Sequence, residues 1–240
     1  MNLYPKLIAL GTVLVVGSAL ASADTIGLNS MPGNGAVNSG TVAYTGGPLS
    51  GGPTTSNISP ATGAVWHLAL PGSEWVSIDP KSGPDGGQGP GTFDPNGTYM
   101  YTFSFTINTA NMYSFTAPLE LLADDTTNLL VNGVLVVPPG TLGTNAHCAD
   151  GQPNCVNPYT LTAAQQAAFL AVINSNTTGN IVLTFDVMQT ASFYQGLDFA
   201  GSLTGTPRVI PPVPEPSTLL LLGTGLIAAA AAVLRMRRVY

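Results

Sequence analysis

The residues best suited to bind a ligand are two adjacent carboxylates, Asp124 and Asp125, at the mouth of a predicted strand. Carboxylate oxygens are typical ligands of Ca²⁺, which takes about six to eight oxygens. Asn128, Asp79 and Asp94 are conceivable further ligands, but the sequence has no Asp-x-Asp-x-Asp-Gly calcium loop to bring them together. The same two aspartates can instead shape a turn by accepting hydrogen bonds from nearby backbone amides. Both interpretations stay open, and the turn is the preferred one.

Two tryptophans, Trp66 and Trp75, are the other candidate binding residues. On a surface they would form a platform for stacking a sugar ring, whereas inside a β-domain they would fill the core. Core filling is preferred because aromatic side chains dominate the interiors of β-sandwiches. The histidines are poor catalytic candidates, since His67 lies among apolar residues and His147 lies in a cysteine loop.

Catalytic motifs are missing from the sequence. It contains no Gly-x-Ser-x-Gly elbow, no His-Glu-x-x-His zinc motif and no phosphate-binding loop. A glycosidase would need two carboxylates across a cleft. The glutamates between the two terminal signals, Glu74 and Glu120, fall in or beside strand patterns. We therefore do not expect an enzyme.

Charge excludes one class of partner. Residues 24–214 hold two basic residues against eleven acidic ones, which gives a net charge of −9. Such a surface repels phosphates, so nucleic acid is not an expected partner. Neutral glycans and divalent cations remain compatible with it. The low charge and abundant Thr, Ser, Asn and Gly are typical of an extracellular β-protein.

The two cysteines, Cys148 and Cys155, enclose a short loop that contains Gly151 and Pro153. In an exported chain this spacing favours a disulfide. A zinc site would need more ligands than two thiolates and His147, and an oxidising compartment opposes it.

Alternating apolar and polar residues predict a mainly β fold. The clearest strand covers 99–107, where apolar residues, most of them aromatic, occupy every second position. A helix is predicted from the capping-box pair Thr162 and Gln165 to near Asn174. We expect an antiparallel β-sandwich, jelly-roll-like, with one short α-helix, plus an N-terminal signal helix and a C-terminal transmembrane helix. Further strands are expected at 65–70, 74–78, 113–116, 119–122, 181–188 and 196–203, a hairpin at 129–137 and a long loop at 79–96.

Both ends of the chain carry predicted targeting signals. Lys6, an apolar stretch and a small-residue pattern predict a secretory signal peptide cleaved between Ala23 and Asp24. At the other end, Pro214, Glu215 and Pro216 precede an apolar run at 219–234. That run is just under the roughly 17–25 residues of a spanning helix, which suits a transient stop. By the positive-inside rule a basic cluster stays cytoplasmic, and here it is formed by Arg235, Arg237 and Arg238.

This tail resembles the PEP-CTERM protein-sorting signal of Gram-negative bacteria, with Pro214, Glu215 and Pro216 as the Pro-Glu-Pro element. The resemblance implies that an exosortase, a membrane protease-transpeptidase, is the partner. It also implies export, a temporary stop in the inner membrane, and a final place at the cell surface or outside the cell. The stretch 123–133 resembles a segment of secreted jelly-roll proteins, including carbohydrate-binding modules and PA14-like domains.

The expected organisation has five parts: a signal peptide at 1–23, a Gly/Ser/Pro-rich arm at 24–60, a sandwich at 61–206, a linker at 207–213 and the sorting signal at 214–240. The expected function is that of a non-catalytic surface or extracellular-matrix protein without a cofactor, associated with exopolysaccharide, biofilm or other surface proteins. The alternative is a lectin-like module that uses Ca²⁺ at Asp124 and Asp125. A polysaccharide-processing enzyme ranks third.

Overall fold

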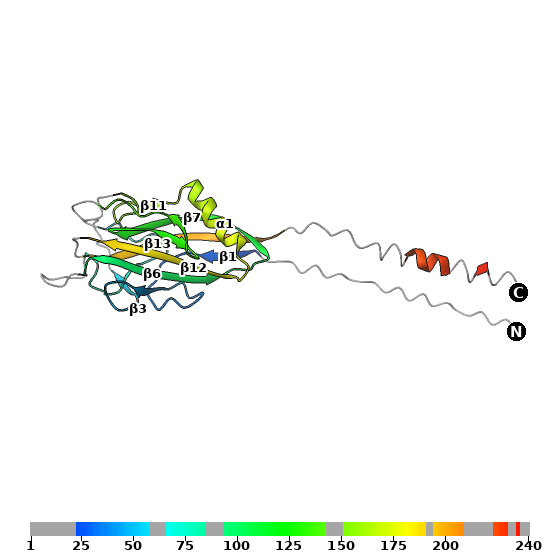
Figure 1. Ribbon diagram of the computed structural model, residues 1–240, viewed down its shortest axis with the longest axis horizontal. Helices are drawn as coiled ribbons and strands as arrows, with labels where there is room; N and C mark the ends of the chain where they lie inside the picture. The colour runs from blue at the N-terminus through cyan, green and yellow to red at the C-terminus, as the bar shows by residue number, and fades with distance from the viewer. Residues whose placement is uncertain are drawn as a thin grey trace. The chain divides into compact units, whose positions relative to one another are not determined.

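The computed structural model describes residues 23–57, 66–84, 94–142, 151–190, 194–208, 223–229 and 234–235 (Figure 1). One compact unit ends at Pro207, and the second covers Arg208–Tyr240. The first unit contains every strand and the helix α1, Ala163–Ser175. The protein is therefore mainly β within the part that the structure describes.

The strands form two antiparallel sheets. The first has six strands in the order β11-β7-β13-β5-β4, with β1 also paired to β13. The second has seven in the order β10-β9-β12-β6-β2-β3, with β8 also paired to β12. In the first sheet the strands are β1 Asp24–Gly27, β4 Thr55–Asn57, β5 Trp75–Ser77, β7 Asn111–Asp124, β11 Tyr159–Thr160 and β13 Gly196–Pro207. In the second they are β2 Val42–Gly46, β3 Gly52–Pro53, β6 Gly97–Thr106, β8 Thr126–Thr127, β9 Leu129–Val131, β10 Val134–Val137 and β12 Asn180–Gln189.

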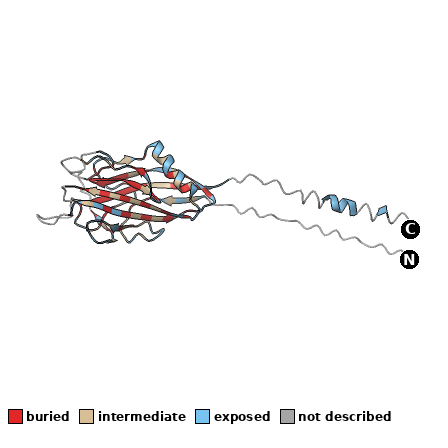
Figure 2. Cartoon of the chain, viewed as in Figure 1, coloured by how far each residue is buried: buried red, intermediate tan, exposed pale blue. Residues whose placement is uncertain are grey.

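Strand β6 confirms the prediction from alternation. It pairs with β12 without a break from Gly97 to Thr106. Its apolar positions point inward, since Tyr99, Tyr101 and Phe103 are almost completely buried. In Figure 2 the residues coloured as buried lie along the strands of the sandwich.

The two sheets share one core. In the first sheet, β7 and β13 pair along most of their length. Phe199 of β13 stacks on Phe185 of β12 with ring centroids 4.7 Å apart, and it meets Phe103 of β6 edge-on at 5.4 Å. These contacts join the two layers, as the sandwich prediction requires.

The N-terminal segment 24–60 differs from the loose arm suggested by its composition. Its residues 24–57 provide β1 to β4, and Leu28, Val42 and Tyr44 are buried in the common core. The Gly and Pro residues reflect tight turns between short strands rather than a free arm. The sandwich therefore begins at β1 and not near residue 60.

Local signals in the sequence were mostly reliable. Asn132 and Gly133 have φ values of 47° and 80°, as a type I′ hairpin turn requires. The Thr162–Gln165 capping box is present in both directions, and α1 buries Phe169. The expected strand at 65–70 is wrong, because residues 66–70 have no strand pairing and cover the outer face of the first sheet.

Several predictions for the termini fall outside the described residues. Nothing is described before Ala23, so the signal helix is among them. Within the predicted membrane run 219–234, the structure describes a helix at 223–229 and residue Leu234. No helix in the described part of the chain combines the length and hydropathy of a membrane span.

The capping box gives a test of how α1 is held. Thr162→Ala removes the side-chain acceptor for the Gln165 N–H, so the free energy of unfolding should fall by about 1 kcal/mol. Urea denaturation followed by circular dichroism measures this change. Thr162→Ser keeps the hydroxyl and is the matched control; equal losses in both variants would contradict the cap.

Candidate functional site

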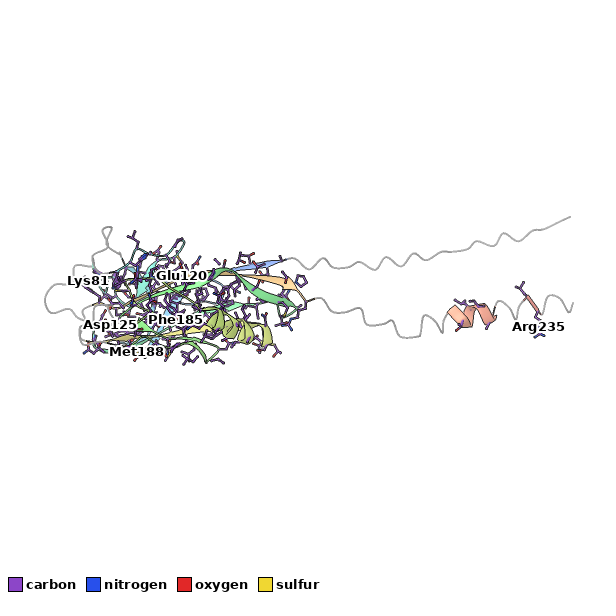
Figure 3. The ribbon with its side chains drawn as sticks, turned by 90° about the horizontal axis from the view of Figure 1, so that it is seen from above. Lys81, Glu120, Asp125, Phe185, Met188 and Arg235 are labelled. Atoms are coloured by element: carbon purple, nitrogen blue, oxygen red, sulfur yellow. The ribbon has the colours of Figure 1, made fainter. Side chains whose placement is uncertain are left out.

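The two adjacent aspartates lie where the chain passes from one sheet to the other. Asp124 ends β7, and the N–H of Asp125 donates to the Met188 carbonyl of β12 at 3.0 Å. Asp125 and Met188 are labelled at the same end of the sandwich in Figure 3. The carboxylate of Asp125 accepts from the Thr190 N–H at 2.7 Å. Asp125 therefore helps to fix this corner through a backbone amide distant in sequence.

Asp124 points to the outer face of the first sheet. Leu121 and Ala123 belong to the core between the sheets, whereas Leu122 belongs to a second cluster on the other side. Alternation places Asp124 on the same side as Leu122. Its carboxylate is completely buried and accepts from the indole N–H of Trp66 at 2.5 Å.

Both tryptophans pack on this outer face, Trp66 from the covering residues 66–70 and Trp75 from β5. Trp66 and Trp75 are 1 % and 0 % exposed and stack with ring centroids 4.2 Å apart. The indole N–H of Trp75 donates to the His67 carbonyl at 3.0 Å. Core filling is therefore their observed role. Gly196 leaves room for the Trp66 ring, because a Cβ there would lie 2.6 Å from it.

A third carboxylate, Asp198, escaped the sequence analysis. It lies on the same outer face of β13 and is completely buried. Its carboxylate accepts from the hydroxyls of Ser30 and Ser73 at 2.7 and 2.6 Å and from the Leu70 N–H at 2.8 Å. It thus holds two segments against the sheet: the N-terminal segment, through Ser30, and the covering segment, residues 66–73, through Leu70 and Ser73. The only available signal was a lone acidic residue in an otherwise apolar strand.

The donors to these carboxylates are neutral, which determines the electrostatics. Burial raises the pKa of Asp198, and hydrogen bonds from Ser73, Leu70 and Ser30 lower it in part. Burial also raises the pKa of Asp124 well above its usual value; the Trp66 hydrogen bond opposes this shift and the Asp125 charge adds to it. In the buried groups the acid form is therefore favoured relative to an exposed aspartate.

The other candidate ligands and catalytic groups do not converge. Glu74, directly before β5, accepts from Ser56 of β4 at 2.5 Å. Glu120 of β7 accepts from Thr160 of β11 at 3.1 Å, and β13 lies between β7 and β5. In the described part of the chain, no group of three or more His, Cys, Asp or Glu side chains is placed to hold a metal ion. A calcium site at Asp124 and Asp125 stays a prediction, with both carboxylates already bonded to protein donors.

The remaining predicted sites are only partly visible. Cys155 is buried and disulfide-bonded, whereas Cys148, its expected partner, lies outside the described residues. At the signal-cleavage site, Ala23 is exposed and Asp24 is the first residue of β1. In the tail, Arg235 is exposed and is labelled in Figure 3. Outside the described residues lie Pro214, Glu215, Pro216, Arg237 and Arg238.

Asp198→Ala should destabilise the sandwich. It leaves the buried Leu70 N–H without its acceptor and removes one of the acceptors of the Ser30 and Ser73 hydroxyls. These hydroxyls keep a backbone carbonyl each, so the cost should be about 1–3 kcal/mol in the free energy of unfolding. Urea unfolding measured by tryptophan fluorescence tests this. Glu120→Ala removes a carboxylate from the same sheet whose bond is exposed, and should change stability by less than about 0.5 kcal/mol. Similar losses in both variants would overturn the fastening role.

Asp124 gives a prediction for pH. Because its pKa is higher in the folded state, the folded state retains a proton that the unfolded state has lost. Stability should therefore fall as pH rises from the unfolded pKa near 3.8 through the higher folded pKa. Asp124→Asn keeps an oxygen for Trp66 and cannot ionise, so the fall should be smaller and the variant more stable at pH 7, by about 1–3 kcal/mol. A parallel pH profile in the variant would contradict this.

Comparison with known protein families gives a match in the C-terminal tail. The family model described as the PEP-CTERM protein-sorting motif matches residues 212–238. No curated protein and no solved structure matches the chain. The motif has an exosortase as its sorting partner and implies export and targeting to the cell surface. The β-rich chain therefore carries a PEP-CTERM protein-sorting motif, the signal read by an exosortase, at residues 212–238.

Proposed function

We propose that this protein is a non-catalytic component of the cell surface or extracellular matrix, associated with exopolysaccharide or with other surface proteins. The single observation that carries the proposal is the sorting motif at residues 212–238. The motif is joined to a sandwich whose buried polar groups are used to hold the domain together. A structural module needs such internal fastening, whereas an enzyme needs reactive groups gathered in a cleft.

The arrangement of the reactive side chains supports a structural role. The carboxylates of Asp124, Asp125 and Asp198 all accept hydrogen bonds from the protein itself. Glu74 and Glu120, the two candidate glutamates, lie on either side of β13 in one sheet, and each is bonded to a hydroxyl of its neighbouring edge strand. A pair of carboxylates acting on one glycosidic bond would have to lie about 5–10 Å apart across a cleft.

The tail is proposed to act as a temporary stop. The run at 219–234 is rich in Ala and Gly and is preceded by Pro214, Glu215 and Pro216. Its arginines would stay in the cytoplasm while the sandwich lies outside. Exosortase would then cut the chain near the Pro-Glu-Pro element and release or re-anchor the domain.

A lectin-like role is the second candidate, and one hollow favours it. A hollow of about 330 Å³ lies on the outer face of the first sheet beside the covering segment. Pro71 and Pro118 give it apolar walls, while Asn29, Glu120 and Ser202 supply polar groups. Apolar walls with a few placed polar groups are the usual form of a small-molecule site. Both tryptophans are buried, so stacking on them is not part of this proposal.

A deletion strain, a strain with an altered Pro-Glu-Pro element and one binding assay test these functions. Deleting the gene should weaken biofilm cohesion or flocculation, and a Pro214→Ala/Pro216→Ala chain should fail to restore it and should keep Arg235–Tyr240 attached. Mass spectrometry of the extracellular protein detects that peptide. Finding it on the mature wild-type protein outside the cell would sink the processing step.

The binding assay separates the matrix role from the lectin role. A glycan array probed with the domain, with and without Ca²⁺, should stay blank for a purely structural component. A signal lost in Glu120→Ala would favour the hollow, and one that requires Ca²⁺ and is lost in Asp125→Asn would favour the calcium site. Turnover on a polysaccharide panel would overturn the non-catalytic proposal.

A further inference from the structure

One buried carboxyl group is not used to fasten the sandwich. Asp94 is 8 % exposed, and among the groups that the structure describes its Oδ2 atom has no hydrogen-bond partner. The next residue is Pro95, so Asp94 stands directly before a tertiary amide. Aspartyl–prolyl bonds are the peptide bonds most readily broken by the neighbouring carboxyl, because the proline nitrogen is more basic than an ordinary amide nitrogen.

We propose that the Asp94–Pro95 bond is a self-cleaving site, at which the buried Asp94 carboxyl breaks its own link to Pro95. The surroundings hold both sides of the bond. The side-chain amide of Gln189, at the end of β12, donates to the Asp94 carbonyl at 3.3 Å. On the other side, the Tyr99 hydroxyl donates to the Pro95 carbonyl at 2.7 Å.

The step balances with water as its only co-reactant. A carboxyl oxygen of Asp94 attacks the Asp94 backbone carbonyl carbon and closes a five-membered cyclic anhydride. The C–N bond to Pro95 breaks, and the carboxyl proton passes to the proline nitrogen. Water then opens the anhydride, which leaves Asp94 with two carboxyl groups and Pro95 as a new N-terminus. The Gln189 donor faces the oxygen on which negative charge develops during the attack.

The groups around Asp94 favour the acid form that this step needs. Burial raises the pKa of Asp94, the Ser82 hydroxyl lowers it in part, and the charge of Asp79 raises it further. Among the described residues, the other titratable groups that interact with it are tyrosines, whose hydroxyls stay neutral near pH 7: Tyr44, Tyr99 and Tyr101. A raised pKa keeps a larger share of the reactive acid at pH values above the usual range of an aspartate.

The chain contains its own control bond. Asp79 precedes Pro80, so the two aspartyl–prolyl bonds have the same chemistry. Asp79 is exposed, and its Oδ1 accepts from the Lys81 N–H at 2.8 Å. A difference in cleavage rate between the two bonds in the folded protein therefore reports the surroundings of Asp94 and not the dipeptide.

Intact-mass analysis of residues 24–240, the chain with its tail still attached, incubated in mild detergent from about pH 4 to pH 7 tests the proposal. We expect fragments that end at Asp94 and begin at Pro95 to accumulate faster as pH falls, about tenfold faster than cleavage at Asp79–Pro80. In urea at the same pH the two rates should become similar, because unfolding removes the special surroundings. Equal rates in the folded protein, or no product from Asp94 over several days, would overturn it.

Variants separate self-cleavage from a contaminating protease and from misfolding. Asp94→Asn should abolish the product. Asp79→Asn should keep it with only a small slowing, because the charge of Asp79 is the smallest of the influences on the pKa of Asp94. Asp94→Glu keeps a carboxyl group but must close a six-membered ring, so it should be at least about tenfold slower. Gln189→Leu should slow cleavage about tenfold or more by removing the donor to the carbonyl. Unchanged cleavage in folded Asp94→Asn, with circular dichroism as the check on folding, would assign the cut to a protease.

Discussion

The constraint on which this sandwich depends is that it buries carboxylates in a chain with almost no cations. Residues 24–214 contain two basic side chains, so the buried aspartates cannot all be neutralised by ion pairs. Asp198 and Asp124 are instead met by hydroxyl, amide and indole donors. Because a buried polar group without a partner is costly, each carboxylate dictates where its donors must lie.

These donors come from segments far apart in sequence. Asp198 holds Ser30 from the N-terminal segment and Leu70 and Ser73 from the covering segment. Asp124 holds Trp66, whose ring stacks on Trp75 and lies against Gly196. The outer face of the first sheet is thereby closed at one end, and a second small core forms beside the main one. Residues 66–70, which have no strand pairing, are held on the sheet by these side-chain hydrogen bonds.

The shortage of cations also shapes how the polar side chains of the described residues are used. Polar side chains that could react are engaged in joining segments, and the surface that remains is acidic and rich in hydroxyls. Such a domain is suited to remain folded outside the cell while the sorting motif determines its destination. Within the described part of the chain, burial creates reactive potential where Asp94 precedes a proline.

The sequence by itself determined the C-terminal sorting motif, the mainly β fold class and the local turns. Four features depend only on residues that are close in sequence, so the sequence alone predicts them. They are the sorting motif, the alternation of β6, the Asn132–Gly133 turn and the Thr162 capping box. Only the tertiary structure decided that residues 24–57 join both sheets, that residues 66–70 form a cover, and that Asp198 is the main fastening point. The physical reason is that burial and hydrogen-bond donors come from distant segments. The identity of a residue fixes what bonds it needs, but only the packed fold fixes which residues supply them.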